Sequence, residues 1–208
     1  TFRAVNIALA NEFADICRAL EIPITDVIDA AATKPYGFMP FLPGPGVGGH
    51  CIPCDPHYLL WQLRKQRVAA PMITQAMVEI AARPTKVIDR VRELLANRGI
   101  GLGGARVLVV GVSYKPDVAD LRESPALEIL AGLYDSGALI GYVDPRFPTL
   151  TLPNGVILES LANPEDFGAN LLLVHTRHSD SDLSWVGPDQ LVLDATYRTT
   201  ELPQSILL

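Results

Sequence analysis

Hydrophobic residues in the first half of the chain recur at steps of three and four positions, which is the period of an amphipathic α-helix. The pattern predicts four helices, over residues 1–21, 25–33, 55–65 and 71–97. Thr25 is expected to cap the second helix, and Asp55 followed by Pro56 forms a suitable N-cap and first-turn pair for the third. The fourth helix contains Pro84 and is expected to stop at Gly99.

The second half of the chain has short hydrophobic runs bounded by turn residues, a pattern typical of buried strands. Five strands are expected, over residues 106–111, 138–143, 155–158, 169–175 and 190–194. Ser124 and Pro125 open a helix between the first two of them. Strands that alternate with helices predict a parallel, doubly wound sheet. The fold class is therefore α/β, with an all-helical domain over residues 1–98 and a Rossmann-like domain over 99–208.

The bulk composition excludes several function classes. A formal net charge of −6 argues against a nucleic-acid partner, which requires clustered Lys and Arg. Apolar runs stay shorter than the roughly 18 residues of a membrane span, so no membrane partner and a cytoplasmic location are expected. The 3 cysteines favour reduced thiols over a disulfide framework. Because the helical pattern is already under way at Thr1, without preceding capping residues, we expect the sequence to be a piece of a longer protein.

Residues 34–54 are rich in Gly and Pro and form too long a connector for a compact domain, which favours a binding role. Gly44, Gly46 and Gly49 formally match the dinucleotide fingerprint G-x-G-x-x-G. No strand is expected before them, so we interpret the match as accidental. The glycines are instead expected to let the backbone approach a ligand while presenting Cys51.

Three chemical interpretations of Cys51 compete. With Cys54 it forms a C-x-x-C pair, which is a redox motif where a strand precedes it. With His50, Cys54 and His57 it could bind zinc, although four ligands within eight residues match structural zinc sites poorly. As a nucleophile, it would have Asp55 four residues further on as a neighbouring carboxylate. The plain structural alternatives are a small buried thiol and a helix-capping carboxylate.

Two long motifs carry a resemblance to a known family. Residues 43–56, PGPGVGGHCIPCDP, resemble the active-site loop of the UDP-glucose, UDP-N-acetylhexosamine and GDP-mannose 6-dehydrogenases, and residues 32–41 resemble the UDP-N-acetylglucosamine branch. Residues 111–125, GVSYKPDVADLRESP, resemble the signature of that family's C-terminal nucleotide-binding domain. The resemblance covers essentially the whole chain and implies that the chain corresponds to the central and C-terminal domains of the family. The family's NAD-binding domain is expected upstream of Thr1.

The resemblance implies a four-electron oxidation of a sugar C6 alcohol to a uronic acid, with NAD as the cofactor. Cys51 would add to the intermediate aldehyde and carry a thioester, and Asp55 would order or deprotonate the water that hydrolyses it. A thiol with an ordinary pKa of about 8.5 needs help to ionise. A helix N-terminus beside Cys51 can supply that help.

The resemblance also implies partners and binding residues. The partners are a UDP-sugar substrate and a second copy of the chain, paired through the helical domain; no metal is implied. Arg122 and Cys51 are expected to face NAD. Residues expected to contact the substrate are Lys34, from the partner subunit, and Phe41, Leu42, Pro43, Gly44, Pro45, Gly46, Gly48, Gly49 and Lys115.

The cations and carboxylates of the second half also have plain structural interpretations. Lys115 and Arg122 could be a pair of solvated charges, although their loop follows a parallel strand at the edge where doubly wound folds bind ligands. Asp144 is expected to be a turn residue, and Cys54 and Arg198 receive no role. The alternative function is a module that dimerises and binds nucleotide sugar without turnover.

Overall fold

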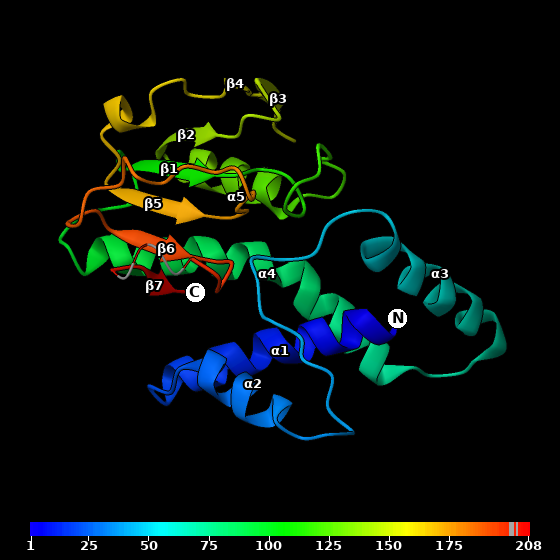
Figure 1. The fold of residues 1–208 in the computed structure, drawn as a ribbon. Coiled ribbons are helices and arrows are strands. Elements are labelled where there is room, and N and C mark those ends of the chain that lie inside the picture. The colour runs from blue at the N-terminus through cyan, green and yellow to red at the C-terminus, as the bar shows by residue number, and fades with distance from the viewer. Residues whose placement is uncertain (200–201, 203) are drawn as a thin grey trace. The chain divides into compact units, whose positions relative to one another are not determined.

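The computed structural model of the chain describes residues 1–199, 202 and 204–208, and these form two compact units (Figure 1). The first unit comprises residues 1–44 and 50–82, and the second comprises residues 45–49 and 83–208. The Gly-rich segment 45–49 thus belongs to the second unit, although the residues on both sides of it belong to the first. Across the described residues, no helix is both long and apolar enough to cross a bilayer. The predicted domain boundary at residue 98 stays a prediction.

Four helices form the first half of the chain, as predicted: α1 Phe2–Ala19, α2 Ile24–Ala32, α3 Cys51–Gln66 and α4 Pro71–Ala96. Two predicted helix starts were wrong. Pro23 occupies the N-cap position of α2 in place of Thr25. His50 occupies that of α3 in place of Asp55, because the Cys54 N–H donates to the His50 carbonyl over 3.2 Å and winds the chain into a helix one turn earlier.

The two faces of α1 differ in the size of their side chains. Its buried face carries small residues such as Ala4, Ala8 and Ala14, which allow close approach of α2 and α3. Its large hydrophobic side chains are exposed instead: Phe2, Leu9, Phe13, Ile16 and Leu20. A helix that exposes its bulkiest apolar residues indicates a surface suited to a partner.

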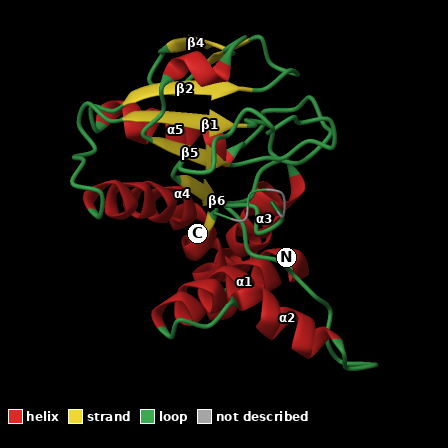
Figure 2. Cartoon of the chain, turned by 60° about the vertical axis from the view of Figure 1, so that its left-hand side comes forward, coloured by secondary structure: helices red, strands yellow, loops and turns green. Residues whose placement is uncertain are grey.

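A parallel sheet of five strands forms the core of the second unit (Figure 2). Its order is β2-β1-β5-β6-β7, with β1 Arg106–Val110, β2 Leu139–Val143, β5 Leu171–Val174, β6 Val192–Asp194 and β7 Ile206–Leu207. The strands β5 and β6 are fully buried, which explains their uninterrupted hydrophobic runs. Helix α5 Pro125–Asp135, with Ser124 at its N-cap as predicted, connects β1 to β2. The α/β fold class is confirmed.

The predicted third strand is wrong as a member of this sheet. Residues 157–159 form β4 Ile157–Glu159, which pairs antiparallel with β3 Thr149–Thr151 in a separate sheet of two strands. Both end residues of β4 are exposed, so it lacks the burial on two faces that a central parallel strand has. The short 3-10 helix η1 Pro164–Phe167 then leads to β5. The strand β7 was missed because two residues carry no readable period.

The strand order reverses beside β1. From β1 the chain passes to β2 on one side, and it then returns to β5 on the other side. In doubly wound folds, ligands bind where the order reverses, at the carboxyl ends of the strands. Here these ends lead into residues 111–124 after β1 and residues 175–191 after β5.

Candidate active site

Cys51 and Asp55 lie on the first turns of α3. Cys51 is the first residue of the helix and its thiol is exposed, while Asp55 follows one turn later and is also exposed. Residues four apart on a helix share a face. The unpaired N–H groups of a first helical turn favour negative charge nearby, including a thiolate. This end of α3 therefore holds a thiol suited to nucleophilic attack and a carboxylate that can accept a proton from water.

The two competing interpretations of Cys51 gain no support from this geometry. Cys51 and Cys54 are free thiols within the first turn of α3, and a Gly- and Pro-rich loop precedes them where a thioredoxin-like motif requires a strand. Zinc would require a cluster that includes His50 and His57. Among the residues that the structure describes, no group of three or more His, Cys, Asp or Glu side chains could hold a metal ion.

The first part of the loop before α3 packs against α1. The Gly44 N–H donates to Oδ1 of the buried Asn11 over 2.9 Å. The Phe41 ring stands edge-on to Phe2, with 6.1 Å between the ring centroids. Lys34 is exposed. Asn11 was not among the predicted site residues, although a polar residue on the alanine face of α1 is a signal that could have identified it.

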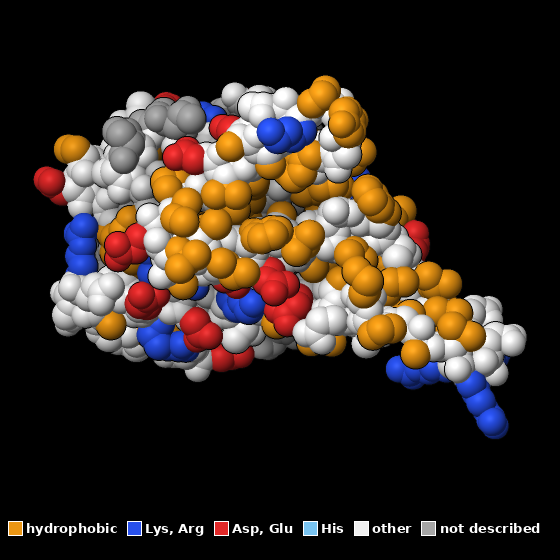
Figure 3. Space-filling model, turned by 90° about the horizontal axis from the view of Figure 1, so that it is seen from below, with side chains coloured by type: hydrophobic (Ala, Val, Ile, Leu, Met, Phe, Trp, Pro, Cys, Tyr) orange, Lys and Arg blue, Asp and Glu red, His pale blue; other side chains and the backbone are white. Residues whose placement is uncertain are grey.

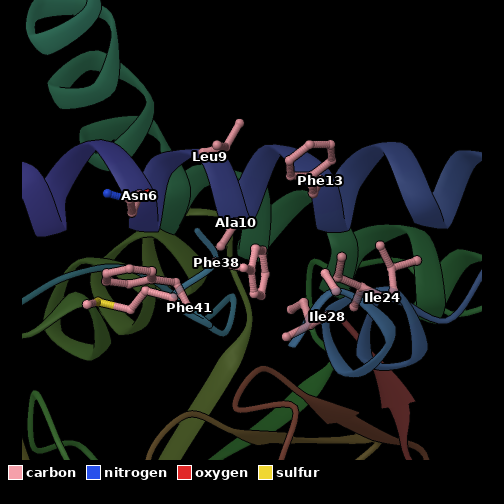
Figure 4. Close-up of a pocket in the computed structure, with 11 residues that line it drawn as sticks. Asn6, Leu9, Ala10, Phe13, Ile24, Ile28, Phe38 and Phe41 are labelled. Carbon is pink, nitrogen blue, oxygen red and sulfur yellow. The ribbon is translucent and has the colours of Figure 1, made fainter. Parts of the chain in front are cut away.

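Phe41 also lines an apolar cavity of about 200 Å³ in the first unit. Figure 4 shows this cavity between α1, which contributes Leu9 and Phe13, and the Ile24 and Ile28 side chains of α2. Apart from Asn6, the residues that line it are apolar, so it does not suit a nucleotide phosphate. Figure 3 shows many hydrophobic side chains on the face that it draws. The contribution of Phe41 to substrate binding stays a prediction.

The second part of the loop, residues 45–49, packs against residues 111–125 within the second unit. The Gly49 N–H donates to the Arg122 carbonyl over 2.8 Å. A Cβ atom on Gly48 would lie 2.5 Å from Tyr114 Cβ and 2.6 Å from the Glu123 carbonyl oxygen. A side chain is therefore excluded by the protein's own backbone, which is a different reason from the ligand approach that we expected. Contact of these glycines with substrate stays a prediction.

The loop after β1 presents two cations at the protein surface. Lys115 is exposed. The Arg122 guanidinium forms a forked pair with Asp120, with Nη2 and Nε at 2.7 and 3.0 Å from Oδ2. The side-chain hydrogen bonds from Arg122, together with its backbone N–H, hold the pKa of Asp120 below its usual value. The Arg122 side chain is 68% exposed, so the pair orients it without contributing much stability.

Asp144 and His178 form a buried pair beneath that loop. Asp144 accepts the Arg146 N–H over 2.9 Å, which is the turn contact that we predicted. It also accepts the Val112 N–H over 2.8 Å and lies 3.1 Å from His178 Nε2. Burial raises the pKa of Asp144, but these hydrogen bonds outweigh it and hold the pKa below its ordinary value. The wider contacts were missed because Val112 and His178 are remote from Asp144 in the sequence.

The described residues do not form a cradle for NAD. Dinucleotide-binding folds place a Gly-rich turn after a strand and an acidic residue, free to bind the ribose, after the next strand. The glycines 44–49 follow an irregular segment, as we expected from the sequence. Asp144 occupies the acidic position after β2, but Val112, Arg146 and His178 already engage its carboxylate.

The turn directly after β1 also lacks the space against the backbone that a dinucleotide pyrophosphate occupies in such folds. A Cβ atom on Gly111 would lie 1.8 Å from the Thr176 carbonyl oxygen, so backbone already fills the space between β1 and β5. NAD is therefore not assigned to this sheet.

Comparison with protein families identifies both halves of the chain. Residues 1–81 match the model described as UDP-glucose/GDP-mannose dehydrogenase family, central domain. Residues 108–197 match the UDP binding domain of the same family. The two matches occur in the order in which the two sequence motifs led us to expect them.

Individual relatives agree with these matches. A UDP-N-acetyl-D-mannosamine dehydrogenase of Methanocaldococcus jannaschii is 32% identical over 180 residues, which cover 86% of this chain and 39% of the relative. A UDP-N-acetyl-D-glucosamine 6-dehydrogenase of Pseudomonas aeruginosa is 34% identical over 145 residues, covering 70% and 34%. The solved UDP-D-ManNAc dehydrogenase of Pyrococcus horikoshii superposes with a TM-score of 0.83 at 26% identity, covering 99% of this chain and 48% of that one. The chain thus spans less than half the length of these relatives, and it belongs to the UDP-glucose/GDP-mannose dehydrogenase family, of which it contains the central and UDP-binding domains.

Proposed function

We propose that this chain supplies the catalytic thiol and the nucleotide-sugar-binding residues of an NAD-dependent 6-dehydrogenase that converts a UDP-N-acetylhexosamine to its uronic acid. The observation that carries the proposal is the exposed Cys51 at the first position of α3, with Asp55 one turn further on. The relatives are named as dehydrogenases of UDP-linked N-acetylhexosamines, which supports this substrate class. The match to a UDP binding domain supports the nucleotide.

The chemistry assigned to this chain uses two side chains. NAD, when bound on the Arg122 side of the substrate, would supply the hydride acceptor for both oxidations. The Cys51 thiolate forms a C–S bond with the C6 aldehyde, and oxidation of the resulting hemithioacetal gives a thioester. Asp55 takes a proton from the water that attacks this thioester. The C–S bond then breaks, which releases the uronate and returns Cys51 to the thiolate form.

In this proposal NAD binds to residues outside this sequence, which the lack of a dinucleotide cradle among the described residues supports. The chain covers 39% of the Methanocaldococcus relative, so the relative has ample length for a further domain. Lys115 and Arg122 then serve as the substrate-side and cofactor-side cations on the loop after β1. Both are exposed, so a ligand from solution can reach them.

A second copy of the chain is proposed to cover the exposed apolar face of α1. Phe2 and Leu20 are 64% and 62% exposed, and Phe13 is 46% exposed, so the face runs along the whole helix. Solvation of so many large apolar side chains is unfavourable. A Phe13→Lys variant should sediment as a monomer where the wild type sediments as a dimer, while a Tyr134→Lys control, on an exposed residue of α5, should not change the mass. A monomeric wild type would overturn the dimer proposal.

The catalytic proposal is tested by comparing two cysteine variants of the complete enzyme. Cys51→Ser should abolish uronate formation, because a Ser hydroxyl is far less ionised than a thiol. It therefore adds poorly to the C6 aldehyde, and the adduct needed for the second oxidation does not form. Cys54→Ser is the matched control, since it changes a thiol in the same helical turn that the mechanism does not use. Wild-type uronate production by Cys51→Ser would refute the nucleophile, and equal losses in both variants would favour a C-x-x-C pair.

A further inference from the structure

Residues 112–117, which carry Lys115, are anchored at both ends of the segment. At the first end, the Val112 N–H donates to Asp144 Oδ2 over 2.8 Å, and Ser124 Oγ donates to the Val112 carbonyl over 2.6 Å. At the other end, the Asp117 N–H donates to His178 Nδ1 over 2.9 Å. Lys115 lies between the two anchors and is itself exposed. Its position thus depends on backbone contacts made by its neighbours.

His178 links the two anchors, because it hydrogen-bonds to both Asp117 and Asp144; Asp144 and His178 are called the relay below. Its Nδ1 accepts a hydrogen from Asp117, so in the neutral ring the hydrogen resides on Nε2 and points at Asp144. His178 and Asp144 are 1% and 0% exposed, and a buried carboxylate and imidazole with this many partners have little freedom to move. The relay therefore fixes the distance between the two ends of the segment.

Asp117 supplies a second reason to regard the segment as held in place. Its backbone has φ of 62°, a left-handed conformation that costs a residue other than Gly free energy. Its side chain accepts hydrogen bonds from the Ser179 N–H over 2.9 Å and from Arg146 Nη2 over 3.3 Å. Arg146 is in turn paired with Asp180 over 2.9 Å. Strain of this kind persists where the surroundings over-determine a conformation.

We propose that Asp144 and His178 are positioning residues for the nucleotide sugar, because together they hold residues 112–117 in the conformation that presents Lys115 to it. The inference rests on the proposed function, which assigns Lys115 to the substrate. The proposal gives a role to Asp144, the acidic residue after β2. In a dinucleotide-binding fold the residue at this position binds a ribose, whereas here it holds the loop that carries Lys115. Neither residue touches the substrate.

Two substitutions of His178 separate the two halves of the relay. His178→Gln places an amide near the Nε2 position, which keeps a donor for Asp144 but removes the acceptor for Asp117. His178→Asn places an amide near the Nδ1 position, which keeps the acceptor and removes the donor. Each variant should raise the Kd of the complete enzyme for UDP-N-acetylglucosamine, measured by calorimetry without NAD, by about fivefold to tenfold, the equivalent of one lost hydrogen bond.

The control is a variant that loses stability at the other end of the strands, the amino-terminal end of the same sheet. Leu102 is 7% exposed and precedes β1 at its amino end, so Leu102→Ala should lower the melting temperature without touching the relay. A positioning role predicts that its Kd stays at the wild-type value even where its melting temperature falls as far as those of the His178 variants. A matching rise in Kd would assign the effect to stability and overturn the proposal.

A double-mutant cycle tests whether the relay acts through Lys115. Lys115→Ala should itself raise the Kd at least tenfold, and His178→Gln added to it should raise the Kd by less than about twofold further. Fold-changes that multiply, or a Lys115→Ala variant with unchanged Kd, would overturn the inference. Because binding is measured without turnover, a complete enzyme that binds UDP-N-acetylglucosamine but forms no uronate would contradict the proposed function alone. A wild type that binds no UDP-sugar would overturn both.

Discussion

The buried histidine after β5 makes the stability of the second unit depend on pH. His175 is 3% exposed, and its Nδ1 lies 2.9 Å from Thr176 Oγ1. The Thr176 hydroxyl donates its own hydrogen to the Ser113 carbonyl over 2.6 Å, so His175 Nδ1 is the donor in that contact. Burial lowers the pKa of His175 from 6.5 to about 4. The folded unit therefore holds His175 neutral at pH values where the unfolded chain protonates it.

The sign and size of the effect follow from this difference in pKa. Between pH 6.5 and pH 4 the unfolded state binds the extra proton, so the free energy of unfolding falls as the pH falls through this window. A tenfold difference in proton affinity corresponds to about 1.4 kcal/mol, so the full effect is about 3 kcal/mol. A change from pH 7 to pH 5 covers more than half of this window, so we expect the free energy of unfolding to fall by about 2 kcal/mol.

The assay is urea unfolding of the 208-residue chain at pH 7 and pH 5. In a Trp61→Phe background, fluorescence of Trp185 reports on the second unit, because Trp61 belongs to the first. His175→Asn is the matched variant, since its amide keeps a donor near Nδ1 but does not titrate. Subtracting its pH dependence from that of the parent removes the contributions of all other groups. Equal losses in the two proteins would show that His175 is not the group responsible.

Two further predictions concern a glycine and the isolated chain. Gly111→Ala should destabilise the second unit by more than about 3 kcal/mol in urea unfolding, because φ is 73° and the new Cβ would lie 1.8 Å from the Thr176 carbonyl oxygen. Gly155→Ala has φ of 85° with open space around it, so it should cost only about 1–2 kcal/mol; similar losses in both would contradict the steric argument. The 208-residue chain should bind UDP weakly in calorimetry but form no NADH from UDP-N-acetylglucosamine and NAD. NADH formation would show that the described residues hold NAD after all.

The periodic patterns predicted the helices and the sheet because both depend on local burial. The helix limits were accurate where a stop signal is local, as at Gly99, whose φ of 72° ends α4. They failed at α3, where Asp55 and Pro56 form a convincing start but the chain is already helical at Cys51. Pro56 is tolerated inside the helix, which a local rule does not foresee.

The candidate site was predictable in its residue types but less so in its supports. Cys51, Asp55, Lys115 and Arg122 stand in continuous motifs that the sequence displays. The supports for the loop after β1 come from Asp144 and His178, which are brought beneath it by two different strands. No pattern along the chain relates these positions, since their contact exists only once the parallel sheet has formed.

Cys51 is proposed to carry the acyl group as a thioester. Asp55→Asn in the complete enzyme should slow hydrolysis of the thioester, because an amide cannot accept the proton from water. The role of helix cap belongs to His50 in the structure, so loss of a cap is not expected to account for the change. Intact-mass spectrometry during turnover of UDP-N-acetylglucosamine with NAD is the most direct test. We expect a uronyl adduct that accumulates in Asp55→Asn and maps to the Cys51 peptide. Unchanged turnover without an adduct, or an adduct on Cys54, would overturn the assignment of Cys51.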